Sequence, residues 1–207
     1  MVITEIKPQK GHLQKIAFDN ESFVLLERDF FILQGLKLGD RLTQEKLNEL
    51  LEESEYIRAK NRALWFLDRA PRSEKTLYEK IVSGNISATA AARAVARLKE
   101  LGLVDDRKYA ENMAERFMEQ NISKRSAFAK MMTKGLPVSI IKETLAETPS
   151  DEVAQVKAVI DKKYKNRLDT KENVAKTVAA LLRRGFSYQS VRTAMKEYKT
   201  ELEYGDY

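Results

Sequence analysis

A repeat with a period close to 50 residues limits the folds that this chain can adopt. Three segments, "LYEKIVSG", "FAKMMTKG" and "VAALLRRG", end at Gly84, Gly135 and Gly185, which are 51 and 50 residues apart. Apolar residues precede each glycine by seven and by three positions, which places each pair on one helix face. These pairs are Leu77 and Ile81, Phe128 and Met132, and Val178 and Leu182. We therefore expect each segment to be a helix that ends in a left-handed glycine C-cap.

Two further helices complete each predicted unit. An apolar pattern follows every glycine and is carried by Ala91 and Val95, by Ile141 and Leu145, and by Val191 and Met195. A third segment fills each interval, around "RALWFLDR", "YAENMAERFME" and "VAQVKAVIDKKY". The alternative to a true repeat is that a helical chain contains three similar segments by chance. The repeat is favoured because the apolar positions agree at several places and the spacing is nearly equal. Stacked repeats of this kind form a curved, elongated array.

The N-terminal part has a different pattern, which predicts a small β-sheet and a short helix. "VITEIK", "LQKIAF" and "FVLL" are short runs of apolar and β-branched residues, with a turn signal at "DNES" before the third. Ile16 and Phe18 fall on one strand face and Lys15 on the other. Thr43 is the predicted N-cap of a helical stretch that ends before Pro71, and Ser73 caps the next helix. The predicted organisation is an extension at 1–54 and three-helix repeats at 55–104, 105–149 and 150–207.

Charge is distributed unevenly along the chain. The net charge of the 207 residues is +6, yet residues 1–55 hold 7 basic and 11 acidic residues. The rest of the chain is basic, which predicts an anionic partner, and nucleic acid is the first candidate. The alternative is a lysine-rich surface that is only solvated. The chain has no cysteine, its first residues lack the apolar core of a signal peptide, and no apolar run approaches the roughly 18 residues that span a bilayer. We therefore expect a cytoplasmic protein without a membrane partner.

No group of residues in the sequence predicts catalysis, a metal site or a cofactor. His12 is the one histidine, and no glycine-rich loop precedes a Lys-Ser/Thr pair. Asp105 and Asp106 are adjacent carboxylates, but neighbours on a helix point about 100° apart and cannot converge on one ion without other ligands. They follow Gly102, so we interpret Asp105 as a helix N-cap and Asp106 as a charge favoured by the helix dipole. Gly84, Gly102, Asp105, Gly135 and Gly185 are predicted structural hinges.

Basic residues are the remaining candidates for function. They recur near the predicted helix junctions and would suit phosphates or an acidic protein groove. Trp65 and Phe66 are predicted to pack in the core, with base stacking as the alternative. The predicted contact residues are Arg69, Arg72, Lys75, Lys80, Arg93, Arg97, Arg125, Lys130, Lys134, Lys176, Arg183, Arg184 and Arg192.

Three motifs together resemble the RecX family of regulatory proteins. They are "AL.FL..R..S...L..KI" from Ala63 to Ile81, "V..LKELGLVDDRKYA" from Val95 to Ala110, and "KGLPVSIIKETL" from Lys134 to Leu145. "LLRRGFSYQSVRTAM" fits the family's more variable end, and the N-terminal stretch with "GLKLGDRLT" looks like an extension found in some members. Each motif is mostly apolar spacing, and their order along nearly the whole chain makes the resemblance specific.

The resemblance implies a regulatory binding protein and not an enzyme. Members bind the filament of the RecA recombinase, are thought to lie in its helical groove and usually inhibit it, which affects recombination, repair and the SOS response. Some members also bind DNA, so we expect weak binding of single- or double-stranded DNA without strong sequence preference, by a monomer. The alternative is a free-standing helix-turn-helix DNA-binding regulator, in which Ser187, Gln189, Ser190 and Arg192 would contact bases.

Overall fold

The protein consists mainly of helices, with a small sheet at its N-terminus. A computed structural model describes residues 1–198 as two compact units, Met1–Asp105 and a second unit that begins at Asp106. The first unit contains β1 (Ile3–Gln9), β2 (Leu13–Phe18), β3 (Phe23–Glu27), α1 (Arg28–Gln34), α2 (Gln44–Arg69), α3 (Glu74–Val82) and α4 (Ala88–Glu100). The second contains α5 (Asp106–Glu119), α6 (Lys124–Thr133), α7 (Val138–Glu147), α8 (Glu152–Lys163), η1 (Lys165–Arg167), α9 (Lys171–Arg183), α10 (Tyr188–Met195) and η2 (Lys196–Tyr198). The predicted fold class, helical repeats after a small sheet, is confirmed.

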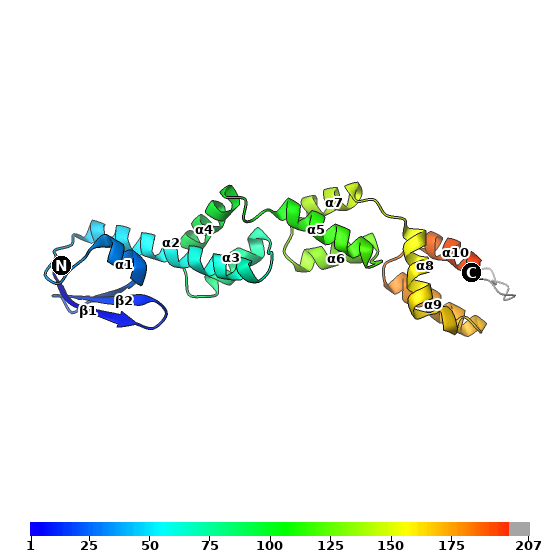
Figure 1. The fold of residues 1–207 in the computed structure, drawn as a ribbon, viewed down its shortest axis with the longest axis horizontal. Helices are drawn as coiled ribbons and strands as arrows, with labels where there is room; N and C mark the ends of the chain where they lie inside the picture. Colours follow the sequence, from blue (N-terminus) through cyan, green and yellow to red (C-terminus); the bar gives the residue numbers. More distant parts are fainter. Residues whose placement is uncertain (199–207) are drawn as a thin grey trace. The chain divides into compact units, whose positions relative to one another are not determined.

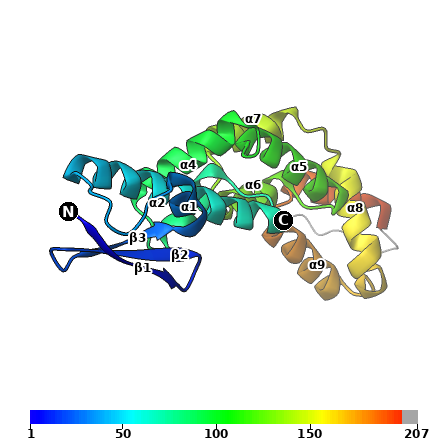
Figure 2. The ribbon, with the colours of Figure 1, turned by 60° about the vertical axis from the view of Figure 1, so that its left-hand side comes forward.

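The three strands form an antiparallel sheet in the order β1-β2-β3 (Figure 2). Ile16 pairs with Ile6 on β1 and with Val24 on β3, which fixes the register. Ile16 and Phe18 are buried on one face and Lys15 lies on the other, as the alternation predicts. The buried face packs on α1 and on the first half of α2, because a three-stranded sheet needs a partner for its apolar side.

Helix α2 belongs to two hydrophobic cores at once. Leu47 and Leu50 pack under the sheet, whereas Ala59 and Ala63 pack against α3 and α4. The boundary expected between residues 54 and 55 therefore falls inside one continuous helix of 26 residues. Thr43 caps this helix as predicted, by accepting a hydrogen bond from the Lys46 amide, and the helix ends before Pro71.

Three groups of three helices follow one pattern, and each has its own core. The groups are the second half of α2 with α3 and α4, then α5 with α6 and α7, then α8 with α9 and α10 (Figure 1). A buried apolar residue sits in the loop between the second and third helix of each group, at Ile86, Leu136 and Phe186. The apolar residues predicted after the glycines, such as Ile141 and Val191, are buried in these cores.

The left-handed residue of the first repeat is Asn85 and not Gly84. Asn85 has φ 57°, and its counterparts Gly135 and Gly185 have φ 78° and 84°. These three positions are 50 residues apart each time, so the true repeat is more regular than the glycines alone indicated. Asparagine visits this conformation at low cost. Gly84 has another reason to lack a side chain, because a Cβ there would lie 2.4 Å from Cζ of Arg62.

This one-residue offset corrects the predicted helix faces in the second and third repeats. Met132 and Leu182, predicted to be core residues, are 43% and 36% exposed. Their neighbours Met131 and Leu181 are fully buried and correspond to Ile81 of the first repeat. Each of the three buried residues lies four positions before the left-handed residue of its own repeat, which is Asn85, Gly135 or Gly185.

Gly102, the predicted break after α4, has the left-handed conformation with φ 68°. The Gly102 amide donates to the Lys99 carbonyl and the Leu103 amide to the Leu98 carbonyl, which together form a Schellman motif. Asp105 then immediately precedes α5, at the position predicted for its N-cap.

Candidate binding surface

Two aromatic residues and four basic residues gather where α2 meets α3. We call Arg62, Trp65, Phe66, Arg69, Arg72 and Lys80 the aromatic–basic cluster. The rings of Trp65 and Phe66 meet edge to face, with centroids 4.9 Å apart. The Phe66 centroid also lies 5.3 Å from Cζ of Arg62, 5.3 Å from Nζ of Lys80 and 5.5 Å from Cζ of Arg72. Phe66 is therefore the centre about which three cations are placed.

Local sequence explains why these residues meet. Helix α2 ends at Arg69, and Pro71 turns the chain into Ser73, the N-cap of α3. Arg62 then reaches the other end of α3, where its Nε donates a 3.0 Å hydrogen bond to the Lys80 carbonyl. This bond satisfies a carbonyl of the last helical turn, which lacks a partner within the helix.

Trp65 is at the surface, which contradicts its predicted place in the core. Its side chain is 52% exposed, and the guanidinium of Arg69 stacks 3.4 Å from its ring centroid. Arg69 Nη1 also donates a 2.7 Å hydrogen bond to the Trp65 carbonyl, which holds the guanidinium in place. The sequence signal was the spacing of these two residues by four, which puts them on one helix face. Phe66 is half-buried against the first helical core, as predicted.

The positive charge of the cluster is not neutralised from within the first unit. Among residues 1–198, no carboxylate forms an ion pair with Arg62, Arg69, Arg72 or Lys80. The Nε atom of Arg72 is buried and has no hydrogen-bond partner in the same part of the chain. A buried donor without an acceptor costs free energy, so this atom needs water or a ligand. Lys75, also predicted, is exposed on α3.

Three other predicted contact residues lie in ion pairs within their own units. Arg93 contacts Glu53 at 2.8 Å and stacks 3.9 Å from the Tyr56 ring centroid. Arg97 pairs with Glu100 at 2.8 Å, and Lys176 pairs with Glu172 at 2.6 Å. Their charges are partly compensated, so they are weaker candidates than the cluster.

The remaining predicted residues belong to the second unit. Arg125, Lys130, Lys134, Arg183 and Arg192 are exposed. Arg184 is half-buried, and its carbonyl accepts hydrogen bonds from the hydroxyls of Ser123 and Ser126. These bonds join α6 to the end of α9 and bring the Gly185 backbone close to Arg125, because a Cβ on Gly185 would lie 3.2 Å from the Arg125 Cβ. The structure thus brings Arg125 of the second repeat close to the backbone of Arg184 and Gly185 in the third.

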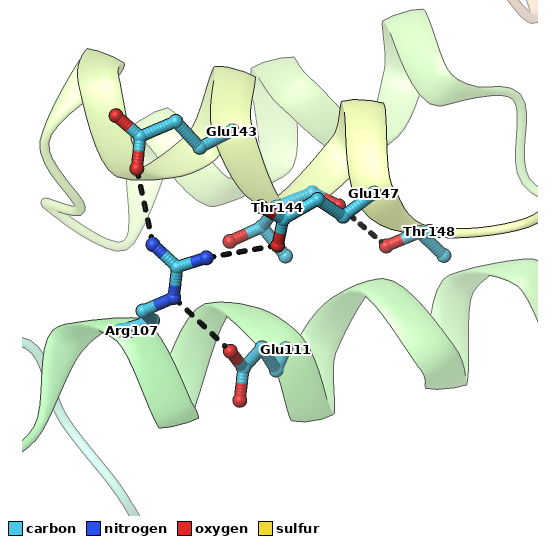
Figure 3. Close-up of polar contacts among 6 residues, drawn as sticks. All are labelled: Arg107, Glu111, Glu143, Thr144, Glu147 and Thr148. Atoms are coloured by element: carbon cyan, nitrogen blue, oxygen red, sulfur yellow. Dashed lines mark hydrogen bonds and ion pairs between the residues drawn. The ribbon is translucent and has the colours of Figure 1, made fainter.

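Two features of the charge distribution were missed in the sequence. The first is a group of five exposed cations around η1, which the run "KKYKNR" could have revealed; they are Lys162, Lys163, Lys165, Arg167 and Lys171. The second is a network centred on Arg107, which links α5 to α7 (Figure 3). Its guanidinium contacts Glu147 at 2.8 Å, Glu143 at 3.1 Å and Glu111 at 3.3 Å. The hydrogen bond and charge of Glu147 are the main cause of the raised pKa of Arg107.

Comparison with known proteins identifies the family. Residues 59–98 match the profile of the RecX first three-helix domain, and residues 150–195 match that of the RecX third three-helix domain. The chain is 27% identical to the regulatory protein RecX of Streptococcus sanguinis, over 97% of this chain and 78% of the relative. It is also 27% identical to the regulatory protein RecX of Clostridioides difficile, over 98% of both chains. The chain belongs to the RecX family.

The fold agrees with RecX structures as well. The chain superposes on a crystal structure of regulatory protein RecX with a TM-score of 0.67 and 19% identity, over 94% of this chain and 98% of that one. The first matched RecX domain spans the second half of α2, α3 and α4, and the third spans α8, α9 and α10. The residues between them form α5, α6 and α7, which repeat the same arrangement.

The third RecX domain uses two of the four predicted base-contacting residues for its own structure. The Ser187 and Ser190 hydroxyls donate to Oε2 of Glu152 at 2.7 and 2.6 Å, and the Ser187 amide donates to Oε1 at 3.1 Å. Burial alone would raise the pKa of Glu152, but these hydrogen bonds outweigh it and lower the pKa. In the first repeat, Glu55 accepts hydrogen bonds from the Ser87 amide and hydroxyl in the same way. This arrangement disfavours the helix-turn-helix alternative, because both serines already have partners.

Across residues 1–198, no helix is both long and apolar enough to cross a membrane. The same residues contain no group of three or more His, Asp or Glu side chains arranged to hold a metal ion.

Proposed function

We propose that this protein modulates the RecA recombinase, most directly by inhibiting it, through binding along the RecA–DNA filament. The observation that carries the proposal is membership of the RecX family, whose curated relatives are named regulatory proteins. In this account the chain acts as a monomer in the cytoplasm, where it affects recombination, repair and the SOS response. It contacts DNA weakly and without strong sequence preference.

The distribution of exposed cations supports several separate contacts along the chain in place of one pocket. The aromatic–basic cluster lies in the first repeat, while Arg125, Arg183 and Arg192 lie in the second and third. None of these three forms an ion pair with a carboxylate among residues 1–198. Several weak contacts on one chain add through effective concentration, so each contributes little and the whole binds tightly.

The test is the rate of ATP hydrolysis by preassembled RecA filaments on single-stranded DNA, with this protein added over a wide concentration range. We expect the rate to fall, and no change at any concentration would contradict the proposal. Preassembled filaments leave little free DNA, so competition for DNA does not produce the effect.

A charge variant and a matched control separate surface contacts from folding. Replacing Arg125 and Arg183 together with glutamine should weaken inhibition while the melting temperature stays unchanged, because both side chains are exposed and unpaired with carboxylates in the described residues. Replacing Lys46 and Lys99 together with glutamine also removes two positive charges, from ion-paired positions outside the predicted contact residues, and this variant should inhibit as the wild type does. Equal inhibition by all three proteins would mean that these arginines lie outside the binding surface.

A further inference from the structure

We propose that the aromatic–basic cluster is a binding site for one unpaired nucleotide of a single strand, with the base stacked on Trp65 and the phosphate held by Arg72 and Lys80. The site deepens the DNA contact of the proposed function, on which it rests, and all of its residues lie within the first unit. It is tested with no RecA present.

Trp65 provides the platform for the base. An indole that is 52% exposed near the end of a helix has not been placed there by core packing. Arg69 lies 3.4 Å from the ring centroid and is fixed by its bond to the Trp65 carbonyl, while the edge of the ring rests on Phe66. The ring is therefore held in position before a ligand arrives. Stacking on such a ring accepts any base, because every base has a π-face.

Arg72 and Lys80 provide the site for the phosphate. Both lie within 5.5 Å of the Phe66 centroid, and neither forms an ion pair with a carboxylate in the described residues. Arg72 Nε is a buried donor without an acceptor, which an anionic oxygen would satisfy. Cations that lie close together around one ring repel each other when no anion is present. A bound phosphate would offset this repulsion.

Arg62 positions the phosphate-binding side chains. Its guanidinium donates to the Lys80 carbonyl at 3.0 Å and occupies the space where a side chain on Gly84 would be. Gly84 thus admits Arg62 to the end of α3, which fixes the backbone that carries Lys80. We regard Arg62 as a positioning residue and Arg72 and Lys80 as ligand contacts.

The combination of groups favours a single strand over the two alternatives. In a duplex the base faces are stacked on one another, so Trp65 would have no free face to contact. An acidic peptide would use the cations but would leave the indole unused. Only an unpaired nucleotide presents a planar base and a phosphate in one residue.

Trp65 is the only tryptophan in the chain, so its fluorescence reports on this site alone. The experiment titrates the full-length protein with four probes and follows the tryptophan emission. The probes are oligothymidylate, an abasic phosphodiester of the same length, a DNA hairpin duplex and polyglutamate. We expect oligothymidylate to quench the emission and to bind at least about five-fold more tightly than the abasic chain, because stacking supplies the difference.

Variants test the assignment of residues by fluorescence anisotropy of labelled oligothymidylate. Trp65→Leu should abolish the preference for oligothymidylate over the abasic chain. Arg72→Gln should weaken binding of both by a similar factor, and Gly84→Ala should weaken both by displacing Arg62. Lys46→Gln removes one positive charge from an ion-paired position in the same unit, outside the predicted contact residues, and should bind as the wild type does. Circular dichroism confirms that each variant is folded.

Two results would overturn the proposal. Equal affinity for oligothymidylate and the abasic chain would show that the base is not stacked. Tighter binding of polyglutamate or of the hairpin, with no quenching by oligothymidylate, would assign the cluster to an acidic protein segment or to duplex DNA. Failure of this test leaves the RecA assay unaffected, since the two use different partners.

Discussion

The hydroxyl of Ser123 donates a 2.7 Å hydrogen bond to the carbonyl of Arg184, across the contact between the second and third repeats. Gly185 follows this carbonyl with φ 84°, and a Cβ there would lie 2.8 Å from Oγ of Ser123. The close approach of the Ser123 side chain to the Gly185 backbone, and not only the left-handed conformation, therefore favours glycine at position 185.

Gly185→Ala is expected to lower the free energy of unfolding by more than about 2 kcal/mol, since it adds a steric conflict to the strain of a left-handed alanine. Gly102→Ala is the matched control, because Gly102 has φ 68° but no atom within 4 Å of a built Cβ. Gly102→Ala should lower the free energy of unfolding by the backbone strain alone, about 1 kcal/mol. Urea denaturation measures both, and equal losses would show that the contact with Ser123 contributes nothing.

Gly135→Val should lower stability by more than about 1 kcal/mol, because valine rarely adopts the φ of 78° found there. The same denaturation experiment measures it. A neutral result would mean that the loop after α6 rearranges to accommodate the side chain.

Glu152 makes the stability of the third repeat depend on pH. Its hydrogen bonds with Ser187 and Ser190 hold its folded pKa below the ordinary value of 4.5. The ionised carboxylate therefore stabilises the fold above pH 4.5, and this contribution is lost as pH falls through the folded pKa. Glu152→Gln should remove that dependence and lower stability at neutral pH by about 1 kcal/mol.

Thermal melts between pH 3 and pH 7 provide the measurement for Glu152, with melting followed at several points in that interval. Glu115→Gln is the control, since Glu115 is exposed on α5 and forms no ion pair among the described residues. If the wild type and Glu152→Gln lose stability in parallel on acidification, this carboxylate is not the source of the dependence.

Arg107 should stabilise the second repeat in a salt-dependent manner. Arg107→Gln leaves Glu111, Glu143 and Glu147 without the cation that all three contact, so α5 and α7 are held less firmly. The melting temperature should fall at low ionic strength, and the difference from wild type should narrow in high salt, where exposed charges are screened. A deficit independent of salt would point to lost packing of the side chain instead.

Each unit should fold alone, because each encloses its own hydrophobic cores. Fragments 1–105 and 106–207 are both expected to be helical and to unfold cooperatively on heating, as circular dichroism would show. A fragment that lacks a cooperative transition would mean that its cores depend on the rest of the chain.

Periodicity predicted the fold because helix faces and strand alternation are local properties of the chain. Ile16 and Phe18 were placed on the correct face, and Thr43 and Ser73 were identified as N-caps. The prediction for Gly84 is wrong because asparagine also adopts the left-handed conformation. Asn85, one residue later, has that conformation in the structure. Choosing Gly84 displaced the predicted helix faces of the other repeats by one residue.

The candidate surface was less predictable, because it depends on contacts distant in sequence. Apolar spacing predicts Trp65 in the core, but the side chain is 52% exposed and the guanidinium of Arg69 stacks on its ring. No local pattern in the sequence singles out Arg62. Its hydrogen bond to the Lys80 carbonyl, 18 residues away, links α2 to α3. Ion pairs such as Arg93 with Glu53 also join residues 40 positions apart, which no local pattern predicts.

Electron microscopy of preassembled RecA–single-stranded DNA filaments, mixed with a saturating amount of this protein, tests the central claim most directly. We predict continuous additional density along the filament, which is reduced for the variant lacking Arg125 and Arg183 and retained for the variant lacking Lys46 and Lys99. Filaments that remain bare at saturation, with the protein bound only to free DNA or to nothing, would contradict the account.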